Sequence, residues 1–342
     1  PAPTEIHTLS RPDALPLCFQ QQLQKKLENE AARSAPDPSP SPTAAAGAVV
    51  IIELFAGLGS GRLAAETIGL QVEAYYASEV APDAVAVLQH GHPEVRLLGD
   101  VKGISAPGVA SIVEAHPAAR FVLLAGPPCV DVSRLNAHRA GAHAAQSGLH
   151  VEVRRIWLLL QQLAPRRAFG LMECTDMAPA DRVEYDKVFG SGPVHLCARH
   201  FSAVTRPRLW WSSHQLPASL PAHMELASKR GVPELLVHGR LQPWSSCLQP
   251  GWSPCAPPTT LGASEGCVFR CFTTRRTRTA PMSQPRGLRE ASPGAIRRWA
   301  KDKWAQAPYQ YASTNMVVSA LDHTRRLLPE EEERLMGIPG GH

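Results

Sequence analysis

The sequence predicts an α/β fold in which helices cover both faces of a doubly wound, mostly parallel sheet. Two observations support this prediction. Residues 48–55 and 121–125 are apolar on both faces, as expected for inner strands of a sheet with helices on each side. Residues 56–63 contain three glycines and turn the first of these strands into a helix. A chain of 342 residues is long enough for one large domain with a smaller domain or an insertion.

The composition divides the chain into four parts. Residues 1–47 combine a short amphipathic helix at 16–32 with a Pro/Ala/Ser linker that cannot build a core. Residues 48–214 form the main domain. Residues 215–310 are proline-rich and irregular, which is typical of an inserted recognition region built of loops. Residues 311–342 are expected to return to the main domain.

The remaining elements are short and are bounded by turn residues. Apolar runs predict further strands at residues 72–78, 95–98, 168–172, 194–197 and 208–213. Helices are expected at 149–163, which carries an apolar stripe, and at 328–336, which has a proline and acidic residues in its first turn.

Charge is distributed unevenly along the chain. The apolar fraction of 44% and the charged fraction of 19% are those of a soluble globular protein. A net charge of +5 is only mildly basic and does not by itself establish a nucleic-acid partner. Between Arg270 and Lys303, however, the sequence contains ten Lys/Arg residues and two acidic residues. This segment predicts a local basic patch that could contact phosphates.

The cysteines argue against a structural metal. The sequence has eight, and none forms a CxxC pair. Cys247, Cys255, Cys267 and Cys271 are the closest approach to a cluster, but their spacings match no common zinc pattern, so we expect no metal. Because no secretory signal and no apolar run near 18 residues is present, we expect an intracellular protein with reduced thiols and no membrane association. The chain starts with Pro1 and is expected to be a fragment of a longer protein.

Three successive strand ends carry residues suited to a nucleoside. Gly57 and Gly59 follow the first strand and allow the backbone to approach a ligand closely. Glu79 follows the second strand, where doubly wound folds grip ribose hydroxyls, and Asp100 follows the third. Each acid alone would more often be a helix cap or a solvated loop residue. All three together favour a nucleoside pocket.

A cysteine and an acid follow the next two strands. Pro127 and Pro128 fix the backbone just before Cys129, so the thiol is carried on a stiff loop beyond the end of a buried strand. A single cysteine is usually an inert buried residue. Glu173, directly after the strand 168–172, could act as a hydrogen-bonding general acid, although it could equally be a cap.

The order of these features resembles the DNA cytosine-5 methyltransferases. The motifs that carry the resemblance are Glu53-Leu-Phe-Ala-Gly-Leu-Gly59, Gly99-Asp-Val101, Gly126-Pro-Pro-Cys129, Arg206-Pro-Arg208 and Leu328-Pro-Glu-Glu-Glu-Glu-Arg-Leu-Met-Gly-Ile-Pro339. The stretches 129–136, 202–211 and 270–277 are most similar to the de novo DNA methyltransferase branch. The resemblance implies a Rossmann-like fold that uses S-adenosylmethionine, with 215–310 as the target-recognition region.

The family resemblance also implies roles for single residues. Cys129 would attack carbon 6 of cytosine, Glu173 would hydrogen-bond the ring, and Arg206 and Arg208 would hold the base and a phosphate. The residues implied in S-adenosylmethionine binding are Phe55, Gly57, Gly59, Glu79, Asp100, Val101 and Pro127. The residues implied in contacts with DNA are Asn136, Arg270, Thr274, Arg275 and Arg278. Of these, Arg275 is expected to read guanine of a CpG step.

Two departures from the family pattern leave alternatives open. The usual Glu-Asn-Val motif is Glu173-Cys174-Thr175, and the final strand and helix of the family would lie beyond His342. The leading interpretation is a nuclear DNA methyltransferase whose partners are DNA and, in addition, other methyltransferase subunits. A catalytically silent regulator of the same fold and a tRNA cytosine-5 methyltransferase are the alternatives. A dehydrogenase is disfavoured because no GxGxxG motif is present.

Overall fold

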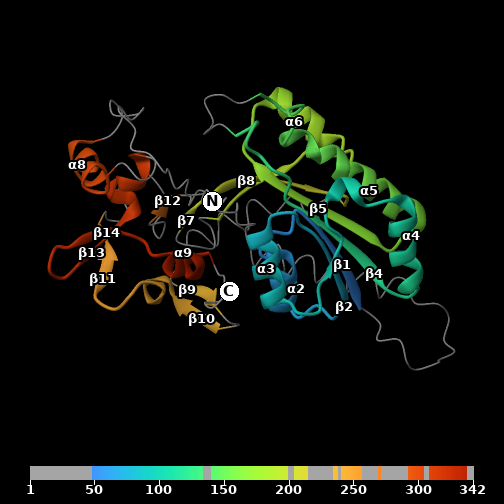
Figure 1. Cartoon of the computed structure of the whole chain (residues 1–342), viewed down its shortest axis with the longest axis horizontal. Helices are drawn as coiled ribbons and strands as arrows, with labels where there is room; N and C mark the ends of the chain where they lie inside the picture. Colours follow the sequence, from blue (N-terminus) through green and yellow to red (C-terminus); the bar gives the residue numbers. More distant parts are fainter. Residues whose placement is uncertain are drawn as a thin grey trace, which may run out of the picture. The chain divides into compact units, whose positions relative to one another are not determined.

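The computed structural model describes residues 48–133, 140–198, 204–214, 234–237, 240–255, 269–270, 292–303 and 308–336. The chain separates into two compact units. Unit 2 contains the described residues 48–196 and 207–214, and unit 1 contains 197–206 and the described residues from 234 onward. Figure 1 shows the sheet of unit 2 with its helices.

Unit 2 is built on a seven-stranded sheet with the order β3-β2-β1-β4-β5-β8-β6. The strands are β1 (Val49–Leu54), β2 (Val72–Ser78), β3 (Arg96–Leu97), β4 (Arg120–Ala125), β5 (Ala168–Thr175), β6 (Val194–Cys197) and β8 (Pro207–Ser212). The first five strands pair in parallel, and β8 pairs antiparallel with β5. The predicted doubly wound, mostly parallel sheet is confirmed.

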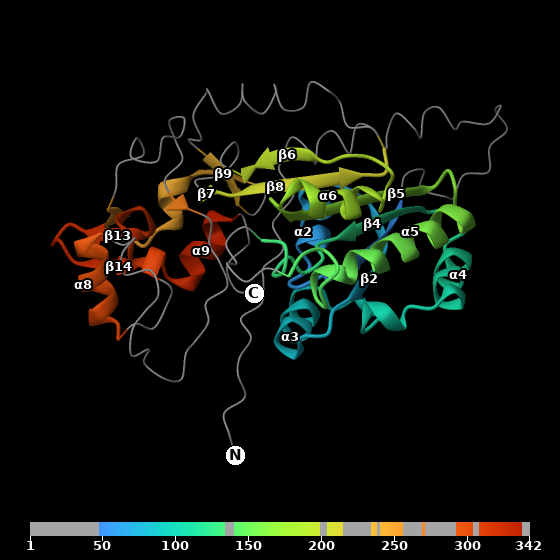
Figure 2. The same cartoon turned by 90° about the horizontal axis from the view of Figure 1, so that it is seen from above.

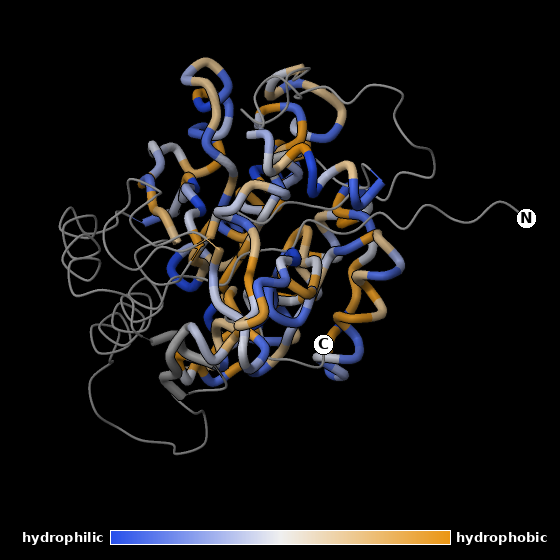
Figure 3. The backbone as a smooth tube through the Cα atoms, turned by 90° about the vertical axis from the view of Figure 1, so that its left-hand side faces the viewer, coloured by the Kyte–Doolittle hydropathy of each residue, from blue (hydrophilic) through white to orange (hydrophobic). Residues whose placement is uncertain are grey.

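Helices cover both faces of this sheet. On one side lie α2 (Ser60–Thr67) and α3 (Pro82–Gly91), and on the other lie α4 (Ala106–Ala115), α5 (His150–Leu163) and α6 (Pro179–Asp186) (Figure 1). Figure 2 shows α4 and α5 on the same side of β4 and β5. In Figure 3, hydrophobic and hydrophilic residues alternate along the helical turns, as expected for helices that bury one face.

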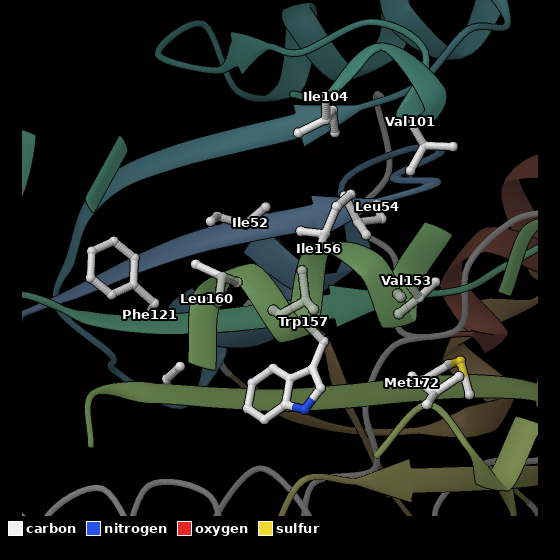
Figure 4. Packing of buried hydrophobic residues seen from close by; sticks show 14 of the residues in the cluster. Ile52, Leu54, Val101, Ile104, Phe121, Val153, Ile156, Trp157, Leu160 and Met172 are labelled. Carbon is white, nitrogen blue, oxygen red and sulfur yellow. The ribbon is translucent and has the colours of Figure 1, made fainter. Parts of the chain in front are cut away.

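The main core lies between the sheet and α5. Ile52 and Leu54 of β1 point toward Ile156 and Leu160 of α5, and all four side chains are buried (Figure 4). Trp157 fills the next position of the helix and packs edge to face on Phe189 at a centroid distance of 5.3 Å. This packing holds the sheet rigid, so the loops at its carboxyl edge start from fixed positions.

Most predicted elements are found within one or two residues of their expected bounds. The exception is the strand expected at 168–172, which continues to Thr175 because β8 pairs with it beyond Met172. Glu173 therefore lies within a strand rather than directly after one. The helix expected at 16–32 falls outside the described residues.

Unit 1 consists of small elements around a separate core. Its strands are β7 (Val204–Thr205), β9 (Glu234–Val237), β10 (Arg240–Pro243), β11 (Trp252–Pro254), β12 (Phe269–Arg270), β13 (Met316–Ser319) and β14 (Thr324–Arg326), and its helices are α8 (Pro293–Lys301) and α9 (Pro329–Leu335). One core cluster joins Val204, Phe269, Val317 and Leu335. Segments far apart in the sequence thus meet in this unit.

The grouping by contacts differs from the predicted division of the chain. Residues 308–336 belong to unit 1, whereas the sequence suggested that 311–342 returns to the main domain. The functional division into a catalytic domain and a target-recognition region stays a prediction. Among the described helices, none is long and apolar enough to cross a membrane.

Candidate active site

The turn after β1 has a backbone that requires its glycines. Gly57 and Gly59 have φ angles of 54° and 77°, in the left-handed region that favours glycine. A Cβ atom on Gly59 would also lie 2.7 Å from Leu88 and 2.8 Å from His92. Phe55 shares the left-handed region with a φ of 58°, which is uncommon for an aromatic residue and occurs most often at functional sites. The turn is therefore held in one strained conformation at the edge of the sheet.

Glu79 joins the ends of the first two strands. One of its carboxylate oxygens accepts from the backbone amide of Gly57 at 2.8 Å, and the other accepts from the amides of Val80 and Ala81 at 2.8 and 2.9 Å. The structure thus places Glu79 beside the glycine turn, as the sequence predicted. The carboxylate thus binds the two residues that precede α3, and it provides no cap to the helix itself, which begins at Pro82.

Asp100 lies at the third strand end. Its side chain caps a short 3₁₀ helix (Val101–Gly103) by accepting from the Lys102 amide at 3.0 Å. Val101 is buried beneath it, and the preceding Gly99 has a φ of 69° and accepts through its carbonyl from the Ser78 hydroxyl at 2.7 Å. Asp100 is exposed and carries a carboxylate at the same edge of the sheet as Glu79.

Sequence reasoning missed Glu53 as a site residue. This side chain is buried at the end of β1, where it accepts from the Tyr75 hydroxyl at 2.7 Å and from the Gly61 amide at 2.9 Å. Burial raises its pKa to about 7, even though both hydrogen bonds act in the opposite direction. An acid within an apolar strand, followed at once by a glycine turn, is the local signal that could have identified it.

These groups fit an adenosine-containing ligand. An aromatic side chain at a strained turn can stack on a base, and carboxylates at two neighbouring strand ends can accept from ribose hydroxyls and from an amino group. Phe55, Glu79 and Asp100 supply these chemical types, and the glycine turn lets the backbone approach closely.

Cys129 follows β4 on the proline loop. Pro127 is buried, and the Cys129 carbonyl accepts from the amides of Val132 and Ser133 at 3.2 and 2.9 Å, so the loop closes into a turn directly after the thiol. The thiol itself is partly exposed and hydrogen-bonds the thiol of Cys174 on β5. Cys129 is therefore presented at the carboxyl edge of the sheet, as the sequence predicted.

A second anchor ties the loop to the start of α5. The amide of Asp131 donates to the Ser147 hydroxyl at 3.0 Å, and the amide of Ser147 donates back to the Asp131 carboxylate at 3.0 Å. Ser147 is fully buried in a short 3₁₀ helix (Ser147–Leu149) that leads into α5. No local pattern predicts this pair, because its members lie 16 residues apart.

Glu173 forms an ion pair with Arg208. The Arg208 Nε lies 2.6 Å from the Glu173 Oε1, and the two side chains are 13% and 18% exposed. The antiparallel pairing of β5 and β8 sets Thr175 opposite Arg208, which brings the arginine next to the acid. A carboxylate, a guanidinium and the thiol of the adjacent strand end are thus available at one edge of the sheet.

Arg206 and Arg270 belong to unit 1. The Arg206 carbonyl accepts from the Ala198 amide at 3.0 Å. The backbone of Arg270 pairs with Thr205 between β12 and β7. The remaining predicted contacts with DNA lie outside the described residues, namely Asn136, Thr274, Arg275 and Arg278.

Comparison with solved structures gives distant similarities. The S. pombe Dnmt2 methyltransferase has a TM-score of 0.48 and 13% sequence identity, covering 86% of this chain and 87% of that chain. A mutant of Spodoptera frugiperda DNMT2 has a TM-score of 0.46 and 16% identity, covering 85% and 89%. A candidate prophage-encoded DNA modification methyltransferase from E. coli has a TM-score of 0.36 and 17% identity, with 48% of this chain and 46% of that chain covered. Because these scores lie below 0.5, the fold assignment rests on the sheet topology alone.

A family model matches the amino-terminal part of the described sheet. The model of the C-5 cytosine-specific DNA methylases matches residues 49–165, a range that runs from β1 through the glycine turn, Glu79, Asp100 and Cys129 to the end of α5. The match thus covers most of the groups that the structure gathers at the carboxyl edge of the sheet. Residues 49–165 of this chain are therefore similar to the C-5 cytosine-specific DNA methylases.

Proposed function

We propose that this chain is a DNA cytosine-5 methyltransferase that forms a covalent adduct through Cys129. The proposal rests on one observation. Two neighbouring parallel strands place a thiol and an acid at the same edge of the sheet. The pairing of β4 with β5 sets Ala125 opposite Met172, so Glu173, the next residue of β5, lies beside the start of the loop that carries Cys129. A nucleophile and a proton-handling group on adjacent rigid elements are what an addition to a heteroaromatic ring requires.

The residue types suit the chemistry of cytosine. Carbon 5 is a poor nucleophile until a group adds to carbon 6. The Cys129 thiolate makes that bond while Glu173 hydrogen-bonds N3, and the ring becomes an enamine. S-adenosylmethionine supplies the methyl group. Loss of the proton from carbon 5 then re-forms the double bond and releases Cys129. Arg208 holds Glu173 in place through their ion pair.

The cofactor would lie at the first three strand ends. Phe55 would stack on the adenine, Glu79 would accept from the ribose hydroxyls, and Asp100 would accept from the adenine amino group. The strained φ of Phe55 and the position of Glu79 beside Gly57 support this assignment. Gly59, Val101 and Pro127 complete the proposed site.

DNA is the proposed substrate, with cytosine in a CpG step as the target. The base must leave the duplex to reach Cys129. Support comes from the excess of ten basic over two acidic residues between Arg270 and Lys303, of which Arg297 and Lys301 are exposed on α8. Guanine reading by Arg275, a relation to the de novo branch, a nuclear location and association with other methyltransferase subunits are parts of the same proposal.

Trapping on a substrate analogue tests the proposal. In 5-fluorocytosine a fluorine replaces the proton at carbon 5 and cannot be lost, so an active enzyme should remain covalently bound to DNA that contains it when S-adenosylmethionine is present. We expect wild-type protein to give a band that resists denaturing gel electrophoresis. Cys129→Ser should give none, because its hydroxyl is a much weaker nucleophile than a thiolate. The matched change Cys197→Ser, at another buried cysteine, should leave the adduct unchanged.

The same assay separates the alternatives. An adduct on tRNA that contains the analogue, with none on DNA, would replace the DNA substrate by RNA. No adduct on either nucleic acid, from protein with measured S-adenosylmethionine binding, would overturn the enzyme and favour the silent regulator. Binding of DNA should also weaken steeply with salt, by about one counterion per neutralised phosphate, and a flat salt dependence would contradict the predicted basic contact surface.

A further inference from the structure

The thiol of Cys129 has a neighbour that the proposed reaction does not use. Cys174 is 1% exposed, lies on β5 directly after Glu173, and hydrogen-bonds Cys129. The two sulfur atoms come from adjacent strand ends, because β4 and β5 are paired in parallel up to Ala125 and Met172. A second thiol in direct contact with a nucleophilic thiol must change the proton equilibrium of the nucleophile.

The contact has a defined direction. Burial raises the pKa of Cys174 well above its usual value, and the hydrogen bond to Cys129 raises it further. Cys174 therefore keeps its proton and is the donor, while Cys129 accepts. A hydrogen bond donated to a sulfur favours the thiolate over the thiol at that sulfur.

Cys174 also interacts with Tyr185. The hydroxyl of Tyr185 donates to the Ser147 carbonyl at 3.0 Å and also interacts with the Cys174 thiol. The Tyr185 ring is buried and stacks on His150 at a centroid distance of 4.4 Å. Tyr185 thus has little freedom to leave Cys174.

The contacts close into a ring beneath the loop. From Cys129 they pass through Cys174 and Tyr185 to Ser147, and Ser147 is bound by two hydrogen bonds to Asp131, two residues after Cys129. One side of this ring is the covalent chain of the loop itself. The ring therefore fixes the direction of the Cys129 side chain as well as the position of its backbone.

We propose that Cys174 is a positioning residue for the reaction, which donates a hydrogen bond to Cys129, orients its sulfur and favours the thiolate. The role of Cys129 as nucleophile is that of the proposed function, on which this inference rests. Cys174 touches no reacting atom of the base. Its contribution is to the fraction of Cys129 that is ionised near neutral pH and to the angle from which the sulfur attacks.

The test is the pH dependence of Cys129 alkylation by iodoacetamide in the full chain. Trypsin should release Cys129 in the peptide 121–134 and Cys174 in the peptide 168–182, each with a single cysteine, so mass spectrometry can follow the two thiols separately. For Cys174→Ala we expect the midpoint of Cys129 alkylation to rise by about half to one pH unit. Near neutral pH, alkylation should slow by roughly three- to tenfold.

Matched variants separate hydrogen bonding from packing. Cys174→Ser keeps a donor of similar size and should restore a midpoint close to that of wild type. Cys197→Ala removes another buried cysteine and should leave the midpoint unchanged. In methyl transfer, Cys174→Ala should lower kcat near neutral pH and regain part of it at higher pH, whereas KM for the nucleic acid should stay the same.

Two results would overturn the inference. One is an unchanged midpoint in Cys174→Ala whose thermal unfolding and S-adenosylmethionine binding match wild type. The other is a rise of the midpoint in Cys174→Ser as large as that in Cys174→Ala, which would assign the effect to packing. If Cys174→Ala does not fold, Cys174→Ser alone provides the test. The alkylation assay needs neither nucleic acid nor methyl transfer. A shifted midpoint without any adduct on 5-fluorocytosine would therefore reject the proposed function, and only the hydrogen bond from Cys174 to Cys129 would be retained.

Discussion

The ion pairs Glu331–Arg325 and Glu173–Arg208 differ in what surrounds their carboxylates. In unit 1, Glu331 is 0% exposed and receives both ends of the Arg325 guanidinium at 2.7 and 2.8 Å. The backbone amides of Leu328 and Gln249 donate to the same carboxylate, each at 2.8 Å. In unit 2, Glu173 pairs with Arg208 through Nε and keeps an exposed fraction of 18%. A pair that is sealed and saturated by donors stabilises the fold, whereas one that keeps access to solvent beside a thiol can take part in a reaction.

The largest expected effect is that of a substitution in the Glu173–Arg208 pair. Glu173→Gln keeps the size of the side chain but removes its charge and its ability to exchange a proton. We expect methyl transfer to fall by roughly 10²- to 10⁴-fold, as for the loss of a general acid or base. Because the two side chains are 13% and 18% exposed, the free energy of unfolding should also fall, by less than for the loss of the fully buried Glu331 carboxylate. Single-turnover transfer of labelled methyl measures the loss, and Glu184→Gln on α6 is the surface control.

If Glu173→Gln lowers the free energy of unfolding but leaves methyl transfer unchanged, Glu173 has a structural role like that of Glu331. Equal methyl transfer by Glu173→Gln and wild type would remove the acid from the mechanism. In that case the contrast between the two pairs would concern only their burial.

A substitution in the Glu331–Arg325 pair should instead lower the free energy of unfolding. Glu331→Gln leaves the Arg325 guanidinium partly buried without its counter-charge, and breaking such a pair costs about 3–5 kcal/mol. Urea unfolding followed by circular dichroism measures this change. The neighbouring exposed acid of α9 provides the control, and Glu330→Gln should stay within about 0.5 kcal/mol of wild type.

The pH dependence of Glu331 gives an independent check. Burial alone would raise its pKa, but the hydrogen bonds from Arg325 and from the two amides outweigh burial and lower it below 4.5. A lowered pKa in the folded state means that the stabilisation is present above pH 4.5 and is lost as the pH falls through the folded pKa. The difference in unfolding free energy between wild type and Glu331→Gln should therefore shrink in acid. A constant difference would contradict the ion pair.

Glu53 extends the comparison to a buried acid that is held by neutral donors. Its pKa is raised from 4.5 to about 7, and the hydroxyl of Tyr75 and the amide of Gly61 are its donors. The folded state therefore holds this proton more tightly than the unfolded state, so stability should fall by about 3 kcal/mol as pH rises from 4.5 to 7. Glu53→Gln is neutral at every pH and should remove this slope.

Unfolding experiments in urea at several pH values measure the Glu53 effect as the difference between variant and wild type. Glu114→Gln changes an exposed acid on α4 and should leave the slope unaltered. The nearby charges that could shift the midpoint are Glu79 and Arg62. A slope that persists in Glu53→Gln would assign the pH dependence to other groups.

The sequence predicted the parts of this architecture that depend on local pattern. The apolar strand at 121–125 and the glycine turn at 56–63 are encoded by consecutive residues, and both lie where they were expected. The end of β5 was misplaced because its last residues are held by pairing with β8, a strand more than 30 residues further along the chain. The contact of Cys174 with Cys129 and Tyr185 escaped prediction for the same reason, since only tertiary structure brings them together.

The smallest expected effect concerns an acid that is exposed and unpaired by any described arginine. If Asp100 accepts from the adenine amino group, Asp100→Ala should weaken S-adenosylmethionine binding by about tenfold, the value of one lost hydrogen bond to a charged group. Isothermal calorimetry measures the dissociation constant. Because Asp100 also caps the 3₁₀ helix by accepting from the Lys102 amide, Asp100→Ser serves as the matched control, since serine is a good N-cap without a carboxylate. Equal weakening in both variants would support the adenine contact, whereas recovery of affinity in Asp100→Ser would reduce Asp100 to a cap and leave Glu79 as the acid proposed to bind the cofactor.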